Sequence, residues 1–284
     1  ALAINTIVAT VVPREQYGEG LGYFTLGPTL STAIGPAAGL LLLRHGGFDP
    51  IIITCSVAAG ISLLLLPLLD VGDVELTEEQ VAETKGFKLT NYVEIKAVPI
   101  SVTMMIVFLC YSSVSSFLAL YSEYIRLTTA ADLFFLVFAV MIFVSRPYVG
   151  RSFDEKGENS VIYAATLVFA IGLGILAVAY HGAILLLSAV VMGLGFGAAQ
   201  ACGRALSAKV APLHRMGQAA STFYVFGDTG IGLGPLICGL LIPLTGYRGM
   251  YGVMAAVAAA SLVVYHLMHG RHAGRPRAGS PADP

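Results

Sequence analysis

One acidic residue lies far inside a long apolar stretch of this chain. Asp228 follows Gly217 by eleven residues, which places it about 16 Å along a helix and near the middle of a bilayer. A carboxylate at that depth is costly unless it is paired, hydrated or protonated. Asp228 is therefore a candidate for proton uptake and release. Alternatively, its carboxylate bonds locally to Thr229 or to an unpaired carbonyl among the neighbouring glycines.

Arg204 is the candidate partner of Asp228. It lies near the end of the preceding apolar stretch. A long basic side chain near a helix end extends readily to the membrane surface, and we expect this of Arg204. Because the two stretches follow one another in the sequence, Arg204 could instead reach inward and pair with Asp228.

Hydroxyl groups are concentrated in the apolar stretch Val98–Tyr121. Tyr111, Ser112 and Ser115 supply a density of hydroxyls that suits the wall of a water-filled cavity. Alternatively, serines such as Ser115 bond back to carbonyls of their own helix.

The segment Arg146–Asn159 is rich in charges of alternating sign. Asp154 can cap the helix that follows or pair with Arg146 or Arg151. We interpret the segment as a cytoplasmic latch, a set of contacts that breaks when the protein opens inward. The alternative is that Asp154 only caps the helix and that the loop charges only set the orientation of the protein in the membrane. The residues assigned to this latch are Arg146, Gly150, Arg151, Asp154 and Gly157.

The elements that carry these residues are predicted to cross a membrane. Apolar residues make up 56% of the 284 residues and charged residues only 12%, about half the charged share of a soluble domain. The mean hydropathy is +0.80. A bilayer core needs about 20 apolar residues per helix. The stretches that reach or approach this length are Leu21–Leu43, Ile51–Leu69, Val98–Tyr121, Leu133–Val149, Val161–Tyr180, Ala183–Leu206, Ala219–Leu244 and Met250–Met268.

Basic residues are distributed unequally between the two sets of alternating connections. One set carries twelve Lys and Arg residues, whereas the other carries Arg44, Arg126 and Arg248. The positive-inside rule places the basic set and the C-terminus in the cytoplasm of a multi-pass protein of the cell membrane. The longest connection, 70–97, is interpreted as the linker between two halves, and residues 269–284 as a disordered cytoplasmic tail.

The chain repeats itself at a distance of 199 residues. Pro13, Gly18, Phe24, Gly35, Pro36, Gly47 and Phe48 recur without a gap as Pro212, Gly217, Phe223, Gly234, Pro235, Gly246 and Tyr247. This distance fits half of a transporter built from two related helical bundles.

The repeat predicts an all-α membrane protein with a partial first bundle and a complete second one. The short apolar stretch Ala1–Val12 is then the second half of a fourth helix, and about three helices are expected before it. Residues 1–69 are assigned to the end of the first bundle, with a fifth and a sixth helix. Residues 98–268 are assigned to the six helices, seventh to twelfth, of the second bundle.

Three segments make the chain similar to the major facilitator superfamily, and within it to the twelve-helix drug/proton antiporters. The first segment, from Gly27 to Leu40, resembles a glycine-spaced antiporter motif that ends in GPxxGG, although Leu40 replaces the last glycine. The second segment keeps the G-x3-D-x2-G spacing of a cytoplasmic gating motif at Gly150, Asp154 and Gly157. Glu155 and Glu158 stand in place of basic residues. The third repeats the first. The residues of the first and third are Gly27, Gly35, Pro36, Gly39, Gly234 and Pro235.

The resemblance implies a fold of two bundles and a function. It implies alternating access between the bundles and proton-coupled export of small lipophilic molecules. In this family the fourth, fifth, seventh, eighth, tenth and eleventh helices line the cavity. That set adds Thr25, Thr29, Gln200 and Tyr224 to the cavity-lining candidates Tyr111, Ser112 and Ser115.

Other classes of function find little support in the sequence. No Ser-His-Asp, Walker or dinucleotide pattern indicates an enzyme or an ATP-driven pump. The four cysteines lack CxxC spacing, and we expect neither a metal nor a cofactor. The expected partners are a small-molecule substrate, protons and the lipid bilayer, without nucleic acid, and we expect a monomer. The alternatives are an exporter of a metabolite, sugar or metallophore, and a membrane receptor or scaffold that does not transport.

Overall fold

The structure is a computed structural model in which the described residues form helices and turns. It describes residues 27, 31, 34–35, 38–39, 41–44, 46–65, 93–211 and 215–271, without the side chains of 146–157. No β-strand occurs among these residues. The all-α class predicted from the sequence is therefore confirmed.

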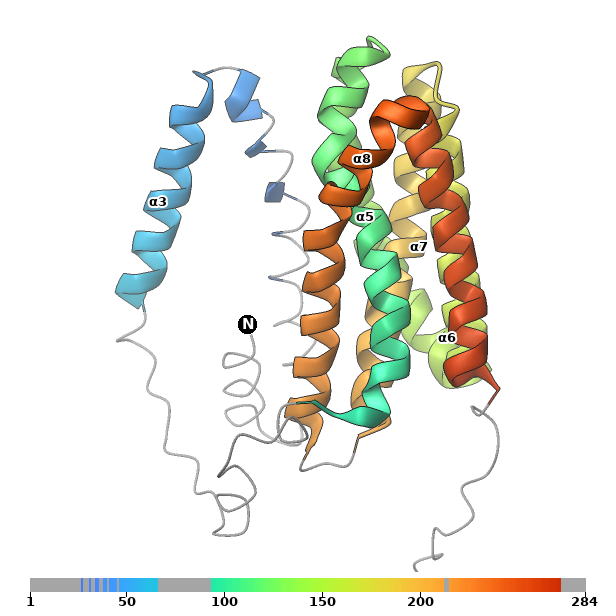
Figure 1. Ribbon diagram of the computed structural model, residues 1–284. Helices are drawn as coiled ribbons and strands as arrows, with labels where there is room; N and C mark the ends of the chain where they lie inside the picture. The colour runs from blue at the N-terminus through green and yellow to red at the C-terminus, as the bar shows by residue number, and fades with distance from the viewer. Residues whose placement is uncertain are drawn as a thin grey trace, which may run out of the picture.

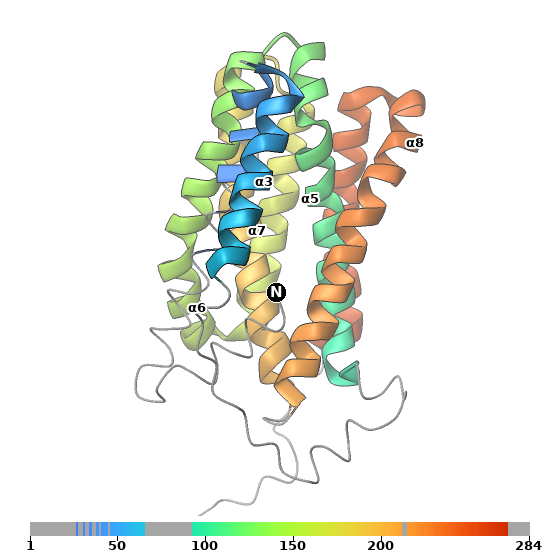
Figure 2. The same cartoon turned by 90° about the vertical axis from the view of Figure 1, so that its left-hand side faces the viewer.

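Five long helices carry the described part of the chain. They are α3 (Phe48–Leu65), α5 (Val98–Tyr124), α6 (Thr128–Ala177), α7 (Gly182–Lys209) and α8 (Met216–Tyr265). A short 3-10 turn, η4 (Ile95–Ala97), precedes α5, and a π-helical turn, η6 (His266–Gly270), follows α8. Figure 1 shows α5 to α8 side by side and α3 standing apart from them. In Figure 2, the view from the α3 side, α6 lies on the left and the upper part of α8 on the right, and α5 crosses from between them at the top to the start of α8 at the bottom.

Six helical segments of the described residues are long and apolar enough to cross a membrane. They are Phe48–Leu65, Ile95–Tyr124, Thr128–Ser145, Glu158–Ala177, Gly182–Lys209 and Met216–Gly270. The last contains two of the predicted spans, because Gly246 has non-helical backbone angles (φ 69°, ψ 175°) and the chain reverses there. Seven predicted spans therefore have a helical counterpart, and most of the eighth, Leu21–Leu43, lies outside the described residues.

The connection predicted at residues 145–160 is not a loop. Its backbone is helical, so that α6 runs from Thr128 to Ala177 as one element. The two limbs of α6 nevertheless run in opposite directions along α7. The first limb runs parallel to α7, because an added Cβ at Gly182 would meet Ala130 and one at Gly197 would meet Ile142. The second limb runs antiparallel to it, because an added Cβ at Gly195 would meet Phe169 and one at Gly172 would meet Met192. The chain therefore reverses in the expected segment but does so with helical backbone, because charged residues such as Asp154 to Lys156 indicate a solvated surface and leave the backbone conformation open.

The bundle has two distinct ends. The lower end in Figure 1 is where α5 and α8 begin and α7 ends, and we call it the basic end because it carries Lys209, Arg215 and Arg271. The opposite end carries Arg44, Arg126 and Arg248. These two groups match the unequal sets of connections in the sequence.

Glycines let α8 approach α5 closely. An added Cβ at Gly230 would lie 2.2 Å from the Met105 carbonyl oxygen, and one at Gly234 would lie 2.8 Å from the carbonyl oxygen of Leu109. At Gly227 it would lie 3.1 Å from the Phe108 ring. The three glycines recur at helical spacing and form one face of α8. Small residues at such positions are typical of closely packed helices in membrane proteins.

The repeat is visible in the backbone as well as in the sequence. Gly47 and Gly246, which are 199 residues apart, both have positive φ angles of 74° and 69°. Both glycines lie at the same end of the protein, opposite the basic end, and each follows one helical segment and precedes another. Only glycine adopts such angles without strain, which explains why both positions carry it.

Candidate functional site

Asp228 lies on the face of α8 that is turned away from α5. Its neighbours Gly227 and Gly230 are buried against α5, whereas Asp228 and Thr229 are exposed. Within the described residues, no hydrogen bond or ion pair involves the Asp228 carboxylate. The Thr229 hydroxyl donates to the Val225 carbonyl at 2.7 Å instead of bonding to Asp228. The local bond considered from the sequence is therefore not formed.

Arg204 does not meet Asp228 in the structure. It is half-buried on α7, next to Gly203, which packs against Met104 and Phe223. No ion pair between Arg204 and any carboxylate occurs among the residues that the structure describes. The proposed pairing of Arg204 with Asp228 stays a prediction.

The hydroxyl-rich helix turns out to use most of its polar groups inside the bundle. Tyr111 is buried and stacks on Phe196, with ring centroids 4.3 Å apart, and on Phe138 at 5.6 Å. Ser112 is also buried, and its hydroxyl donates to the Leu109 carbonyl at 2.7 Å. Ser115 is exposed and donates to the Ser112 carbonyl at 3.2 Å. Tyr111 and Ser112 therefore contribute to packing in this state, and the serines bond back to their own helix.

The remaining cavity and motif candidates are only partly covered by the structure. Gln200 and Tyr224 are half-buried on α7 and α8, and Pro235 is half-buried beside the tightly packed Gly234. Gly27, Gly35 and Gly39 are helical, and an added Cβ at any of them would meet no described atom within 4 Å. The candidates that lie outside the described residues are Thr25, Thr29 and Pro36.

The predicted latch segment forms the turn of α6 at the basic end. The backbone of Arg146, Gly150, Arg151, Asp154 and Gly157 is helical, and their side chains are outside the described part. Just beyond them, the Glu158 carboxylate accepts a hydrogen bond from Lys209 Nζ at 2.7 Å. His269 Nε2 lies 3.5 Å from the other Glu158 oxygen. The turn of α6, the end of α7 and the end of η6 are thereby joined by charged groups.

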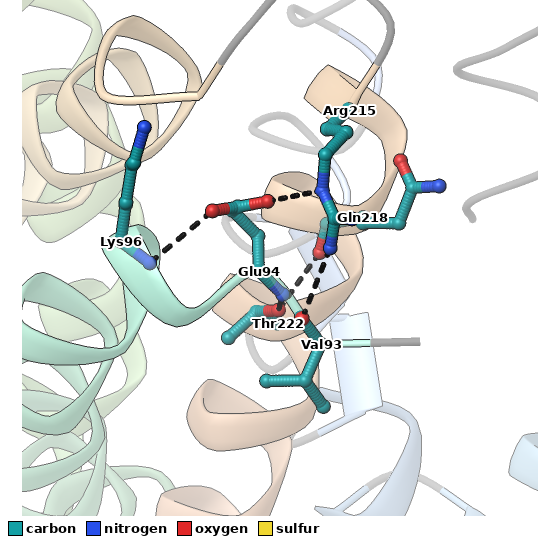
Figure 3. Close-up of polar contacts among 6 residues, drawn as sticks. All are labelled: Val93, Glu94, Lys96, Arg215, Gln218 and Thr222. Carbon is teal, nitrogen blue, oxygen red and sulfur yellow. Dashed lines mark hydrogen bonds and ion pairs between the residues drawn. The ribbon is translucent and has the colours of Figure 1, made fainter. Parts of the chain in front are cut away.

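A second polar network at the basic end holds the segment before α5 against α8 (Figure 3). Arg215 Nε donates to the Glu94 carboxylate at 2.5 Å, and its Nη2 donates to the Val93 carbonyl at 3.4 Å. The Glu94 backbone N–H donates to the Thr222 hydroxyl at 2.9 Å. Glu94 is only 5% exposed, so the ion pair is shielded on its acidic side. We call Val93, Glu94, Arg215 and Thr222 the linker anchor, because their contacts fix the chain directly after residues 66–92.

Sequence reasoning missed the linker anchor. Glu94 falls within the predicted linker 70–97 and received no role of its own, and Arg215 is one of the twelve basic residues that indicate topology. The two residues are 121 positions apart, and no local pattern relates them. The available signal was a carboxylate four residues before an apolar span, at the membrane end where another helix begins.

Replacing Glu94 with glutamine is expected to loosen the linker anchor. The loss of a partly buried ion pair should raise the amide hydrogen exchange rates of residues 93–97 and 215–222 about tenfold. Hydrogen exchange of the purified protein in nanodiscs, read by mass spectrometry, measures this. Glu123→Gln, at an exposed position near the opposite end of α5, is the control. Equal exchange in both variants would mean that the Glu94–Arg215 pair does not hold the segment.

The opposite end has its own arginine contacts. Arg44 bonds the Asp132 carboxylate, and its Nη2 donates to the Thr128 carbonyl at 3.1 Å. Arg248 Nη2 donates to the Ala179 carbonyl at 3.1 Å, and its guanidinium lies 4.1 Å from the centre of the Tyr180 ring. Arg248 thus joins parts of the α5–α8 bundle, whereas Arg44 reaches that bundle from before the 66–92 segment.

The helices and their charged ends define a multi-pass membrane protein, and comparison with known proteins specifies the class further. The model of the Major Facilitator Superfamily matches residues 1–228 and 144–283. The chain therefore belongs to this superfamily of membrane transporters.

Individual relatives are similar only at low identity. An MFS-type transporter of Methanocaldococcus jannaschii, MJ1560, is 22% identical over 270 residues, which cover 93% of this chain and 69% of the relative. Multidrug resistance protein MdtG of Salmonella typhimurium is 26% identical over 266 residues, which cover 89% and 64%. The chain thus spans about two thirds of the length of these relatives.

A solved structure supports the same fold. The crystal structure of the human organic anion transporter MFSD10 superposes with a TM-score of 0.63 at 13% identity. The superposition covers 91% of this chain and 66% of that protein. At this identity the similarity concerns the fold alone.

Proposed function

We propose that this protein is a proton-coupled exporter of small lipophilic molecules that works by alternating access between two helical bundles. It would be a multi-pass protein of the cell membrane with the basic end and the C-terminus in the cytoplasm. The observation that carries the proposal is Asp228, a carboxylate inside a membrane-length helix, exposed beside a face that packs tightly on α5. The similarity to a multidrug resistance protein supports the class of substrate.

The proposed coupling follows from the cost of burying a charge. A carboxylate at mid-membrane is stable in its charged form while water reaches it, and burying it in that form costs several kcal/mol. Proton uptake removes this cost and permits the bundles to close around the site. Release of the proton on the other side of the membrane then resets the cycle. Asp228 is the group assigned to this step.

Two further features of the proposal involve the structural elements around Asp228. The Gly-Pro sequences at Gly35 and Gly234 would form matching seams, which are lines of close but flexible contact between neighbouring helices, one in each half. At Gly234, α8 packs closely against α5. The helical turn of α6 that contains Asp154 would act as the cytoplasmic latch. It lies next to the Glu158–Lys209 pair at the basic end.

Two other functions remain as alternatives. An exporter of a metabolite, sugar or metallophore would use the same coupling with a more polar substrate. A receptor or scaffold would need neither an exposed carboxylate at mid-membrane nor repeated Gly-Pro seams. Substrate competition in a transport assay separates the first alternative from the proposal, and the absence of any transport would favour the second.

Purified protein, expressed from its complete reading frame and reconstituted in liposomes, tests the proposal directly. An imposed pH gradient is expected to drive accumulation of a lipophilic fluorescent cation, and a protonophore should remove that accumulation. Transport that persists after the gradient has collapsed would show that protons are not the coupling ion. No transport of lipophilic or polar probes would contradict the transporter assignment itself.

A further inference from the structure

Arg44 forms an ion pair with Asp132 that connects the two halves of the chain. Of the ion pairs among the described residues, Arg44–Asp132 is the one that joins a residue before the 66–92 segment to a residue after it. None of the residues of α3, which begins four residues after Arg44, is buried. Arg44 therefore ties the described first-half residues to the α5–α8 bundle at the end opposite the predicted latch.

The acceptor side of this tie is a rigid part of the second half. Asp132 and Thr128 lie in the first turns of α6, which follow a tight turn where Leu127 N–H donates to the Ser122 carbonyl at 2.8 Å. The start of α6 also packs against the start of α7, where an added Cβ at Gly182 would lie 3.1 Å from Ala130. Arg44 thus bonds to a site that cannot follow it if the two halves separate.

The donor side is placed where the halves would move. Arg44 precedes Gly47, whose positive φ ends the helical segment and whose N–H donates to the Leu43 carbonyl at 3.0 Å. A displacement of this helix end relative to α6 would break both Arg44 contacts together. The tie is therefore sensitive to the separation of the halves at this end.

The energetic balance of the pair suits a contact that breaks and re-forms. The side chains of Arg44 and Asp132 are 35% and 19% exposed, so water can replace part of the interaction. In addition, the Asp132 Oδ1 atom is buried without a hydrogen-bond partner among the described residues. A half-satisfied carboxylate holds its partner less firmly than a fully bonded one, because the unpaired oxygen gains hydration when the contact opens.

We propose that Arg44, with Asp132 and Thr128, is the outer latch of the transport cycle: it holds the two halves together at the end opposite the cytoplasmic latch and releases when the cavity opens on that side. The proposal rests on the alternating-access function proposed above. It assigns Arg44 and Asp132 as positioning residues, which act on the balance of conformations and make no contact with substrate.

Distance measurements across the opposite end test the outer latch. Spin labels at Asp49→Cys and Thr129→Cys, both exposed, report the separation of the halves by double electron–electron resonance in nanodiscs. Cys55 is exposed and is changed to serine first, whereas Cys110, Cys202 and Cys238 are buried. The wild-type background is expected to give mainly the short distance.

Neutralising either partner is expected to favour the open form. Asp132→Asn and Arg44→Gln should each raise the ratio of long to short distances about tenfold, as for the loss of a partly buried ion pair. The double exchange Arg44→Asp with Asp132→Arg should bring the ratio back towards the original value. Arg248→Gln and Glu123→Gln, which change charges at the same end without touching the pair, should leave it unaltered.

The outcomes separate the latch from the proposed function. Unchanged distances in Asp132→Asn and Arg44→Gln would overturn the latch, and so would a double exchange whose effect is the sum of those of Arg44→Asp and Asp132→Arg measured singly. These distances are measured without substrate or gradient. A protein that fails to transport in a pH gradient but responds in this way would keep the latch and lose the proton-coupled export.

Discussion

Asp228→Asn is expected to abolish transport driven by a pH gradient. Asparagine has nearly the same shape as aspartic acid but cannot release a proton, so it fixes the site in its neutral form. The rate of gradient-driven accumulation in liposomes should fall at least about a hundredfold, which corresponds to the several kcal/mol at stake when a charge is desolvated. Substrate binding and exchange of substrate across the membrane without a gradient should persist, because neither requires net proton movement.

The neighbouring residue supplies the matched control for Asp228. Thr229 is also exposed, and its hydroxyl bonds only to the Val225 carbonyl among the described residues. Thr229→Val should therefore leave the gradient-driven rate within about twofold of wild type. If Asp228→Asn transports at the full rate, Asp228 has a structural role and the proton must be carried by another group.

Gly230→Ala is expected to disrupt the contact between α5 and α8. The added methyl group would lie 2.2 Å from the carbonyl oxygen of Met105, which belongs to the backbone of α5 and cannot rotate away. Overpacking of this kind costs about 1–3 kcal/mol, and here the two helices must move apart to relieve it. The purified variant should unfold at a clearly lower temperature in detergent and should express less well.

Gly232 offers a close comparison on the same helix. It lies two residues further along α8, and an added Cβ there would meet no described atom within 4 Å. Gly232→Ala should be neutral or slightly stabilising, by up to about 1 kcal/mol, because alanine has the higher helix propensity. Equal melting temperatures for the two variants would mean that the close approach at Gly230 is unimportant for stability.

The spans were predictable because the membrane imposes a strong and local requirement on the sequence. A run of about 20 apolar residues is long enough to cross a bilayer, whatever its neighbours are. The break at Gly246 was also visible, as the short connection between two such runs. The helical turn of α6 was not, because charges such as Asp154 indicate only that a segment meets water and leave its backbone conformation open.

The functional side chains were harder to place, because hydropathy does not tell which neighbour a helix face meets. Tyr111 and Ser112 looked like parts of a cavity wall, yet Tyr111 lies between Phe138 and Phe196. The direction of a polar group inside an apolar helix depends on the packing of helices far apart in sequence. The same limit hid Glu94 and Arg215, whose partnership exists only after α5 and α8 have come together.

The paired corners at Gly47 and Gly246 imply an approximate two-fold symmetry between the halves of the molecule. Two hairpins that reverse through glycines of like conformation present equivalent surfaces to each other, as do the subunits of an isologous dimer. Because both corners lie at the same end of the protein, the symmetry axis runs along the membrane normal and the two sides of the membrane stay inequivalent. The symmetry is broken where the side chains of the halves differ, and Asp228, whose counterpart 199 residues earlier is Thr29, assigns the proposed proton step to the second half alone.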